Sequence, residues 1–109
     1  MSYDVTIGDI DLNITFNISG VFYDHIDGGL PSLDGKTGRQ AGYVLQGFWS
    51  KIEKTRLRLW VSGDVGEPHM AEIYDSPNGW GSLIGALTFA GMLTSACAEF
   101  PRHRVRVFR

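Results

Sequence analysis

The chain has 109 residues, of which 43% are hydrophobic and 20% are charged, and its net charge is −2. This length predicts one domain, residues 1–109, with a hydrophobic core of its own, and the composition argues against extended disorder. A small negative charge argues against a nucleic-acid-binding protein, because such proteins usually carry a clear basic excess.

The first half of the chain begins with the pattern of a β-hairpin. Apolar and polar residues alternate over residues 10–18, and a shorter alternating stretch covers residues 3–7. Gly8-Asp9 between them matches a two-residue hairpin turn. After the hairpin we expect a short helical or irregular apolar segment from Val21 to Ile26. Residues 27–35, rich in Gly, Pro and Asp, predict a loop.

The middle of the chain is dominated by a helical pattern. Thr37 and Gln40 have the spacing of a capping box, and apolar residues then recur every three or four positions, which predicts a helix over residues 38–54. Residues 55–61 fit a strand or a continuation of this helix. Pro68, favoured in a first turn, precedes a short helix that we expect over residues 68–74.

The last third of the chain predicts a second long helix, over residues 82–99, followed by a strand over residues 103–108. The fold class is therefore two-layer α+β. We expect a three-stranded antiparallel sheet, made of the N-terminal hairpin and the C-terminal strand, to pack on two main helices. The arginines of the last strand should then lie near Asp11. The expected core residues are Ile10 or Leu12, Ile14, Phe16, Val44, Leu45, Phe48, Ile52, Leu83, Leu87 and Val105.

The N-terminal residues lack the basic and apolar segments of a signal peptide, and no stretch approaches the ~20 apolar residues of a membrane span. The single Cys97 cannot form an internal disulfide. These features predict a cytoplasmic protein with no membrane partner.

Two sets of polar residues are candidate binding sites. The polar face of the hairpin presents short hydrogen-bonding side chains, and a glycine-flanked tryptophan follows at the entrance of the last helix. Either could contact a protein partner, although a solvated sheet face and a buried structural corner are the more ordinary explanations. These candidate residues are Asp11, Asn13, Thr15, Asn17 and Trp80. An alternative anion site would use the glycine-rich stretch from Gly35 to Arg39, or the terminal arginines Arg104 and Arg106.

Catalytic and metal-binding patterns are weak. His25, His69 and His103 have no ligand spacing, and Asp24-His25 are adjacent in sequence, where side chains rarely face each other. We therefore name no catalytic residue, and we expect neither a metal nor a cofactor.

The strand from Ile10 to Ser19, the turn Asn78-Gly79-Trp80-Gly81 and the helix that ends in Cys97-Ala98-Glu99-Phe100-Pro101 resemble a family of small uncharacterised proteins of phages and bacteria. The resemblance spans both ends of the chain and is loose over residues 28–76. It implies a phage or bacterial origin and the order hairpin, helices, final strand. It implies no reaction and no catalytic residues.

Together these observations favour a non-enzymatic binding protein of phage or prophage type, in its most concrete form an inhibitor of a host or defence protein. Its contact surface would be the loop 27–36, the polar sheet face or the turn at residues 76–81. Three alternatives stay open: a binder of a small ligand or nucleotide, a homo-oligomeric assembly component, and a small enzyme that uses Asp24, His25 or His69.

Overall fold

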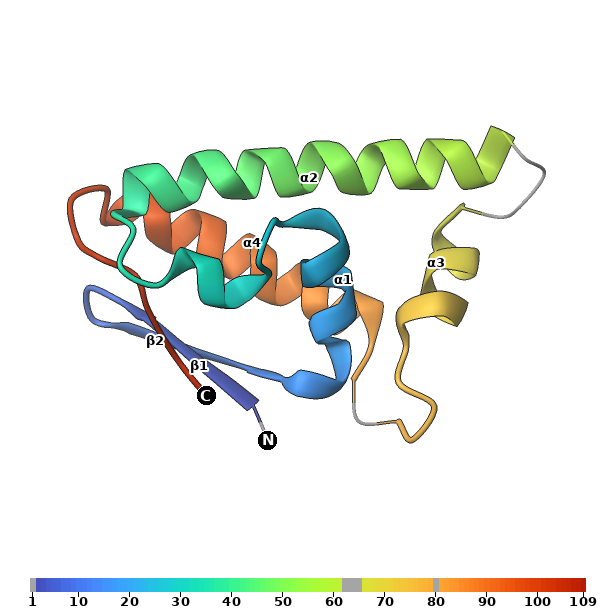
Figure 1. Ribbon diagram of the computed structural model, residues 1–109, viewed down its shortest axis with the longest axis horizontal. Coiled ribbons are helices and arrows are strands. Elements are labelled where there is room, and N and C mark those ends of the chain that lie inside the picture. Colours follow the sequence, from blue (N-terminus) through green and yellow to red (C-terminus); the bar gives the residue numbers. More distant parts are fainter. Residues whose placement is uncertain (1, 62–65, 80) are drawn as a thin grey trace.

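The protein is a two-layer α+β structure in which helices cover one face of a small antiparallel sheet (Figure 1). The computed structural model describes residues 2–61, 66–79 and 81–109; the side chains of residues 59–61 and 66–69 lie outside this description. The elements, in chain order, are β1 (Ser2–Ile7), β2 (Ile10–Thr15), the 3₁₀ helix η1 (Phe16–Ile18), α1 (Ser19–His25), the 3₁₀ helix η2 (Leu30–Leu33), α2 (Gly38–Val61), α3 (Gly66–Tyr74), α4 (Leu83–Glu99) and β3 (Arg106–Phe108).

The sheet has the strand order β2-β1-β3, and both pairs of strands are antiparallel. Ile7 pairs with Ile10, so Gly8 and Asp9 form the predicted two-residue turn. Gly8 has φ +58°, and a Cβ there would lie 2.7 Å from the Phe100 ring, so the turn requires glycine for two reasons. The alternating residues of β1 bury Tyr3, Val5 and Ile7 beneath the helices and leave the opposite face polar.

The third strand lies beside β1 and not beside β2. Arg106 pairs with Thr6, which in turn pairs with Asp11, so a whole strand separates the arginine from this aspartate. The expectation that the terminal arginines would lie next to Asp11 is therefore wrong. The strand itself is also shorter than predicted, because it begins at Arg106, while Arg104 forms an isolated bridge with Thr37.

The predicted strand over residues 10–18 ends early. The Thr15 hydroxyl accepts a hydrogen bond from the Asn17 amide at 3.3 Å, and the chain turns there into η1. Ile18 is buried and Asn17 is exposed, so the alternating sequence correctly predicts which of these side chains is buried. It does not predict that the backbone is a 3₁₀ helix here instead of a strand. A side-chain-to-backbone bond of this kind is a local alternative to the strand ladder.

The segment after the hairpin is more ordered and more buried than the sequence indicates. Residues 19–25 form α1, which buries Val21 and Phe22, and η2 interrupts the predicted loop with Leu30 and Leu33, both buried. The loop prediction for residues 27–35 is therefore wrong at residues 30–33, because these leucines close the core beneath α2.

The longest helix begins as predicted and ends later. The capping box is present, since the Gln40 amide donates to Thr37 Oγ1 at 3.2 Å and the Thr37 amide donates to Gln40 Oε1 at 3.0 Å. The helix continues to Val61, so of the two alternatives for residues 55–61, strand or continued helix, the continued helix is correct. Of the other two predicted helices, α3 begins two residues early, while α4 begins after its Ser82 N-cap.

The turn before α4 has the predicted glycine geometry. Gly79 has φ +77° and its amide donates to the Ser76 carbonyl at 3.0 Å. A Cβ on Gly81 would lie 3.1 Å from a methyl group of Thr15, so this turn packs against the end of β2. Trp80 lies outside the described residues.

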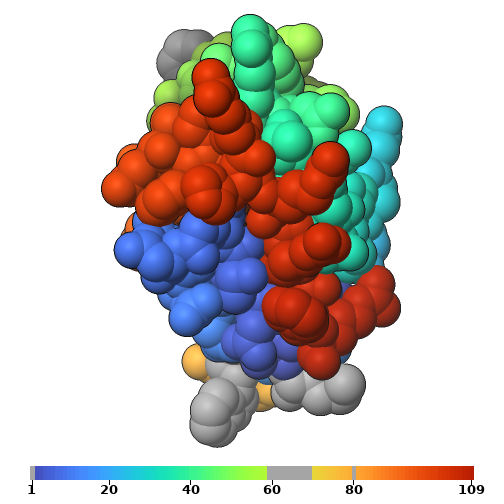
Figure 2. All heavy atoms as spheres, turned by 90° about the vertical axis from the view of Figure 1, so that its left-hand side faces the viewer, coloured from blue at the N-terminus to red at the C-terminus, as the bar shows by residue number. Residues whose placement is uncertain are grey.

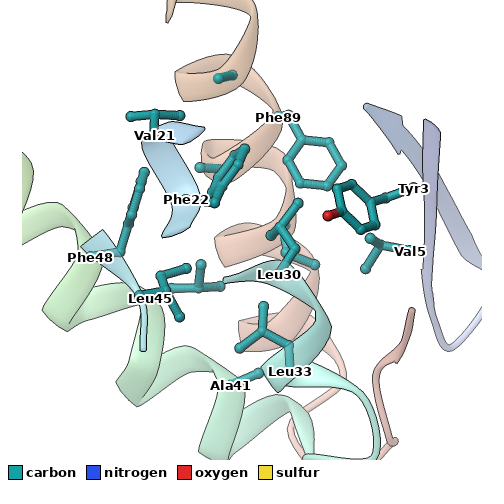
Figure 3. Packing of buried hydrophobic residues seen from close by; sticks show 14 of the residues in the cluster. Tyr3, Val5, Val21, Phe22, Leu30, Leu33, Ala41, Leu45, Phe48 and Phe89 are labelled. Atoms are coloured by element: carbon teal, nitrogen blue, oxygen red, sulfur yellow. The ribbon is translucent and has the colours of Figure 1, made fainter. Parts of the chain in front are cut away.

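The hydrophobic core includes residues of all the elements, and aromatic rings join α1, α2 and α4 within it (Figure 3). Phe22 of α1 stacks on Phe48 of α2, with ring centroids 5.4 Å apart, and meets Phe89 of α4 edge-on at 5.9 Å. Of the predicted core residues, Leu45, Phe48, Ile52, Leu83 and Val105 are buried. The remaining ones are partly buried and pack against the core: Ile10, Leu12, Ile14, Phe16, Val44 and Leu87.

The C-terminal segment closes one end of the molecule, where it lies between the N-terminal strands and the residues before α2 (Figure 2). The Val105 amide donates to the Lys36 carbonyl at 2.7 Å, and the Gly38 amide donates to the His103 carbonyl at 2.8 Å. Among the described residues, no helix is both long enough and apolar enough to cross a membrane.

Gly38 is the position where the backbone elements approach most closely. A Cβ there would lie 2.7 Å from the Cys97 carbonyl oxygen and closer still to that of Phe100. We therefore expect Gly38→Ala to lower the free energy of unfolding by about 1–3 kcal/mol. Gly42→Ala, in the same helix with nothing within 4 Å of the new methyl group, should raise it by about 0.5–1 kcal/mol. Urea unfolding of both variants tests this, and equal effects would contradict the close approach.

Cys97 is buried in α4, and burial raises the pKa of its thiol from 9.0 to about 11. The folded protein should therefore resist a thiol-specific reagent at pH 8 and react only after denaturant is added. Because the folded pKa is the higher one, the thiol's contribution to stability is present below pH 9 and is lost between pH 9 and 11. The denaturant midpoint of unfolding should therefore fall more steeply between pH 9 and 11 in the wild type than in Cys97→Ala. If the midpoints of the two proteins change with pH in parallel, the thiol is not buried as described.

Candidate functional site

A cavity of about 410 Å³ lies between α1, the C-terminal half of α2, and α3. In Figure 1 this half of α2 extends above α1 and α3. We call it the cationic cavity; its lining residues are Asp24, His25, Lys51, Lys54, Thr55, Arg58 and Tyr74.

Helix α2 supplies the three cations of the cavity, and their spacing in the sequence places them on one side of the helix. Lys51, Thr55 and Arg58 are four and three residues apart, and Lys54 lies between them, so all four side chains share one face of the helix. Ile52 is buried on the adjacent face. Because the cationic face of α2 lies next to its buried apolar face, the cations lie at the edge of the hydrophobic core.

His25 forms the inner wall of the cavity, and it is 5% exposed. Its Nδ1 lies 2.8 Å from the Val21 carbonyl oxygen, which can only accept, so we assign the hydrogen to Nδ1. In the neutral ring Nε2 then accepts from the Thr55 hydroxyl at 3.0 Å. Both ring nitrogens are thus engaged: the Nδ1 contact lies within α1, and the Nε2 contact holds α1 against α2.

Tyr74 ties α3 to α1. Its hydroxyl donates to Asp24 Oδ2 at 2.7 Å. Burial first, and then this hydrogen bond to a carboxylate, raise the pKa of Tyr74 well above its ordinary 10.0, while nearby Arg58 lowers it. The hydroxyl therefore remains a donor over the physiological range, and Asp24 orients Tyr74 and not the adjacent His25.

The cations in the cavity are not neutralised by direct pairing. Among the described residues, Lys51, Lys54 and Arg58 have no carboxylate oxygen within 4.0 Å, whereas Arg56 on the same helix forms an ion pair with Glu53 at 2.9 Å. This absence of direct pairing distinguishes the three cations of the cavity from Arg56. It leaves a concentration of positive charge on a chain whose net charge is −2.

The cavity has the chemistry of an anion site. Guanidinium and ammonium groups are the side chains that bind phosphate and carboxylate oxygens most strongly. Thr55 and His25 also have the contact of a nucleophile and its base, but a main-chain carbonyl, and not a carboxylate, orients the imidazole. No group of three metal-ligating side chains occurs within the described part of the chain.

The residues predicted to contact a protein partner lie elsewhere and in different surroundings. Asp11 and Asn13 are exposed on the outer face of β2, while Thr15 caps η1 and Asn17 lies within it. The Asn13 amide already donates to Asp4 Oδ1 at 2.7 Å and to Ser2 Oγ at 3.0 Å. The structure thus places two of these residues on one sheet face and does not test their role.

The three arginines of the alternative anion site are not gathered at one point. Arg39 lines a separate cavity between the ends of α2 and α4, Arg104 donates to the Gly35 carbonyl at 2.6 Å, and Arg106 lies on the outer face of β3. The exposed ring of His103 lies 5.1 Å from that of Phe100. The side chain of His69 lies outside the described residues.

The cationic cavity could not be recognised from the sequence, for a specific reason. The spacing of Lys51, Lys54 and Arg58 indicates a common face only if residues 55–58 are helical, and the sequence also fits a strand there. Tyr74 lines the cavity only because α3 packs beside α1 and α2, and no local sequence pattern predicts where a helix packs.

Comparison of the chain with protein-family models, with curated proteins and with solved structures finds no match. The resemblance inferred from the strand and turn motifs therefore stays a prediction, and the function must be argued from the site.

The contact between Thr55 and His25 can be tested directly. Thr55→Val keeps the shape of the side chain but leaves Nε2 of a buried imidazole without its donor, which should lower the free energy of unfolding by about 1–3 kcal/mol. Thr55→Ser keeps the hydroxyl and should cost less than half as much. Chemical denaturation measures both; equal losses would show that packing, and not the hydrogen bond, matters at this position.

Proposed function

We propose that this protein is a small non-enzymatic binding protein whose ligand is a small anion of the phosphate type. The observation that carries the proposal is the cationic cavity, in which Lys51, Lys54 and Arg58 converge without a carboxylate partner among the described residues. Like charges held close together repel one another, and an anion bound between them removes that repulsion.

The donor set favours phosphate over a single carboxylate. The guanidinium of Arg58 can hold two phosphate oxygens at once, while Lys51 and Lys54 add two point charges on the same side of the helix. Three cations match a multiply charged anion better than a single negative charge.

The polar groups at the inner wall favour binding over reaction. Both nitrogens of His25 are engaged, and the Tyr74 hydroxyl donates to Asp24. These contacts hold three elements in place around the cavity. They support a rigid binding site with no side chain that must gain or lose a proton.

The predicted inhibitor of a host or defence protein remains an alternative, with a homo-oligomer as another. The ligand-binding alternative is preferred because Asn13, at the centre of the predicted partner surface, is already hydrogen-bonded to β1. The cationic cavity, by contrast, presents groups whose bonding capacity is unused within the described structure.

The proposal is tested by titrating the protein with inorganic pyrophosphate at low ionic strength, using isothermal titration calorimetry. Lys54→Ala and Arg58→Ala should each weaken binding at least about fivefold, because a charge pair at 4 Å contributes about 1 kcal/mol or more. Salt should weaken binding to the wild type in the same experiment.

Arg56→Ala is the matched control. Arg56 lies on the same helix, pairs with Glu53 and lines neither of the two cavities beside His25. Its removal should leave pyrophosphate affinity nearly unchanged. The absence of binding to the wild type, or an equal loss in Arg56→Ala and Arg58→Ala, would overturn the proposal.

A further inference from the structure

A second cavity, of about 340 Å³, adjoins the cationic cavity and has a different chemistry. The two share His25 and Lys51 as lining residues, so they lie next to each other along one side of α2. The second cavity adds Tyr43, Phe48 and other apolar groups to its walls. We call it the aromatic cavity.

Helix α2 forms the floor of the aromatic cavity and leaves it open at one position. Tyr43, Gly47 and Lys51 are spaced four residues apart and therefore lie in line on one face. A Cβ on Gly47 would meet nothing within 4 Å, and the Tyr43 side chain beside it is 62% exposed. The result is a shelf of bare helix backbone, with an aromatic ring at one end and an ammonium group at the other.

We infer that the ligand is a phosphate ester that carries a planar aromatic ring, the class to which nucleoside phosphates belong. The ring lies on the Gly47 shelf beside Tyr43, and the phosphate lies between Lys51, Lys54 and Arg58. The inference rests on the proposed function, because it extends the anion site into the neighbouring cavity.

The dimensions of the helix agree with such a ligand. Gly47 and Lys51 are separated by about 6 Å along the helix axis, so a short linker such as a pentose connects a ring at one to a phosphate at the other. A ring stacked on an exposed tyrosine adds affinity that a bare phosphate lacks. Apolar walls with a few polar or charged groups are typical of small-molecule sites.

The charges along both cavities support an anionic ligand of this length. Lys36 also lines the aromatic cavity, so four cations, Lys36, Lys51, Lys54 and Arg58, line the groove formed by the two adjoining cavities. Two carboxylates, Asp24 and Asp27, also line it, and Asp24 is engaged by Tyr74. The groove therefore carries a positive excess on an acidic protein.

The experiment compares ADP, pyrophosphate and adenosine as probes by isothermal titration calorimetry. ADP should bind about tenfold more tightly than pyrophosphate, since stacking of a base contributes about 1–3 kcal/mol. Adenosine, which lacks the phosphates, should bind more weakly than either. Gly47→Leu should remove the tenfold advantage of ADP and leave pyrophosphate affinity unchanged. Tyr43→Ala, which alters only an exposed side chain, should reduce the advantage in the same way if Gly47→Leu fails to fold.

Gly91→Leu is the control for a leucine placed at an open helical glycine. Gly91 is exposed on α4 and lines neither cavity, and a Cβ there would meet nothing within 4 Å. This variant should leave the preference for ADP intact. If ADP binds no more tightly than pyrophosphate, or if Gly91→Leu and Gly47→Leu act alike, the inference is overturned while the anion site stands. If neither probe binds, the proposed function fails as well.

Discussion

The contact between Phe22 and Phe48 determines the geometry on which the candidate site depends. These buried rings stack with centroids 5.4 Å apart and thereby fix α1 against α2. His25 follows Phe22 by less than one turn, and Thr55 follows Phe48 by two turns, so the contact that closes the core also brings His25 Nε2 within 3.0 Å of the Thr55 hydroxyl. The inner wall of the cationic cavity is thus an extension of the core and inherits its rigidity.

Helix α2 has two faces with different roles, one buried in the core and one lining the candidate site. Its inner face buries Ala41, Leu45 and Phe48, and an adjacent face carries the cations of the groove. The acidic side chains Asp4 and Asp11 lie on the outer face of the sheet, which the helices do not cover. Arg106 lies on this outer face as well, so the sheet presents both signs of charge, whereas Lys51, Lys54 and Arg58 form a stripe of one sign on α2.

The sequence correctly predicted the features that depend only on neighbouring residues. The hairpin turn at Gly8-Asp9 and the capping box at Thr37 follow from neighbouring residues, and both are present. The apolar segment from Val21 to Ile26 was expected to be helical or irregular, and it is the helix α1. The buried turn η2 was missed, because its burial depends on where α2 packs and a short apolar run gives no such information. The site was missed for the same reason, since α1, α2 and α3 each contribute a wall.

Helix α3 forms the third wall of the cationic cavity, beside α1 and α2. Helix α3 contributes the buried Met70 to the core, and the Tyr74 hydroxyl binds Asp24 at its C-terminal end. Because Tyr74 at the end of α3 lines the cavity together with Arg58, a ligand that touches both side chains also stabilises the docked position of α3. The Tyr74–Asp24 hydrogen bond holds this wall in position before a ligand binds, and such preorganisation reduces the free-energy cost of binding.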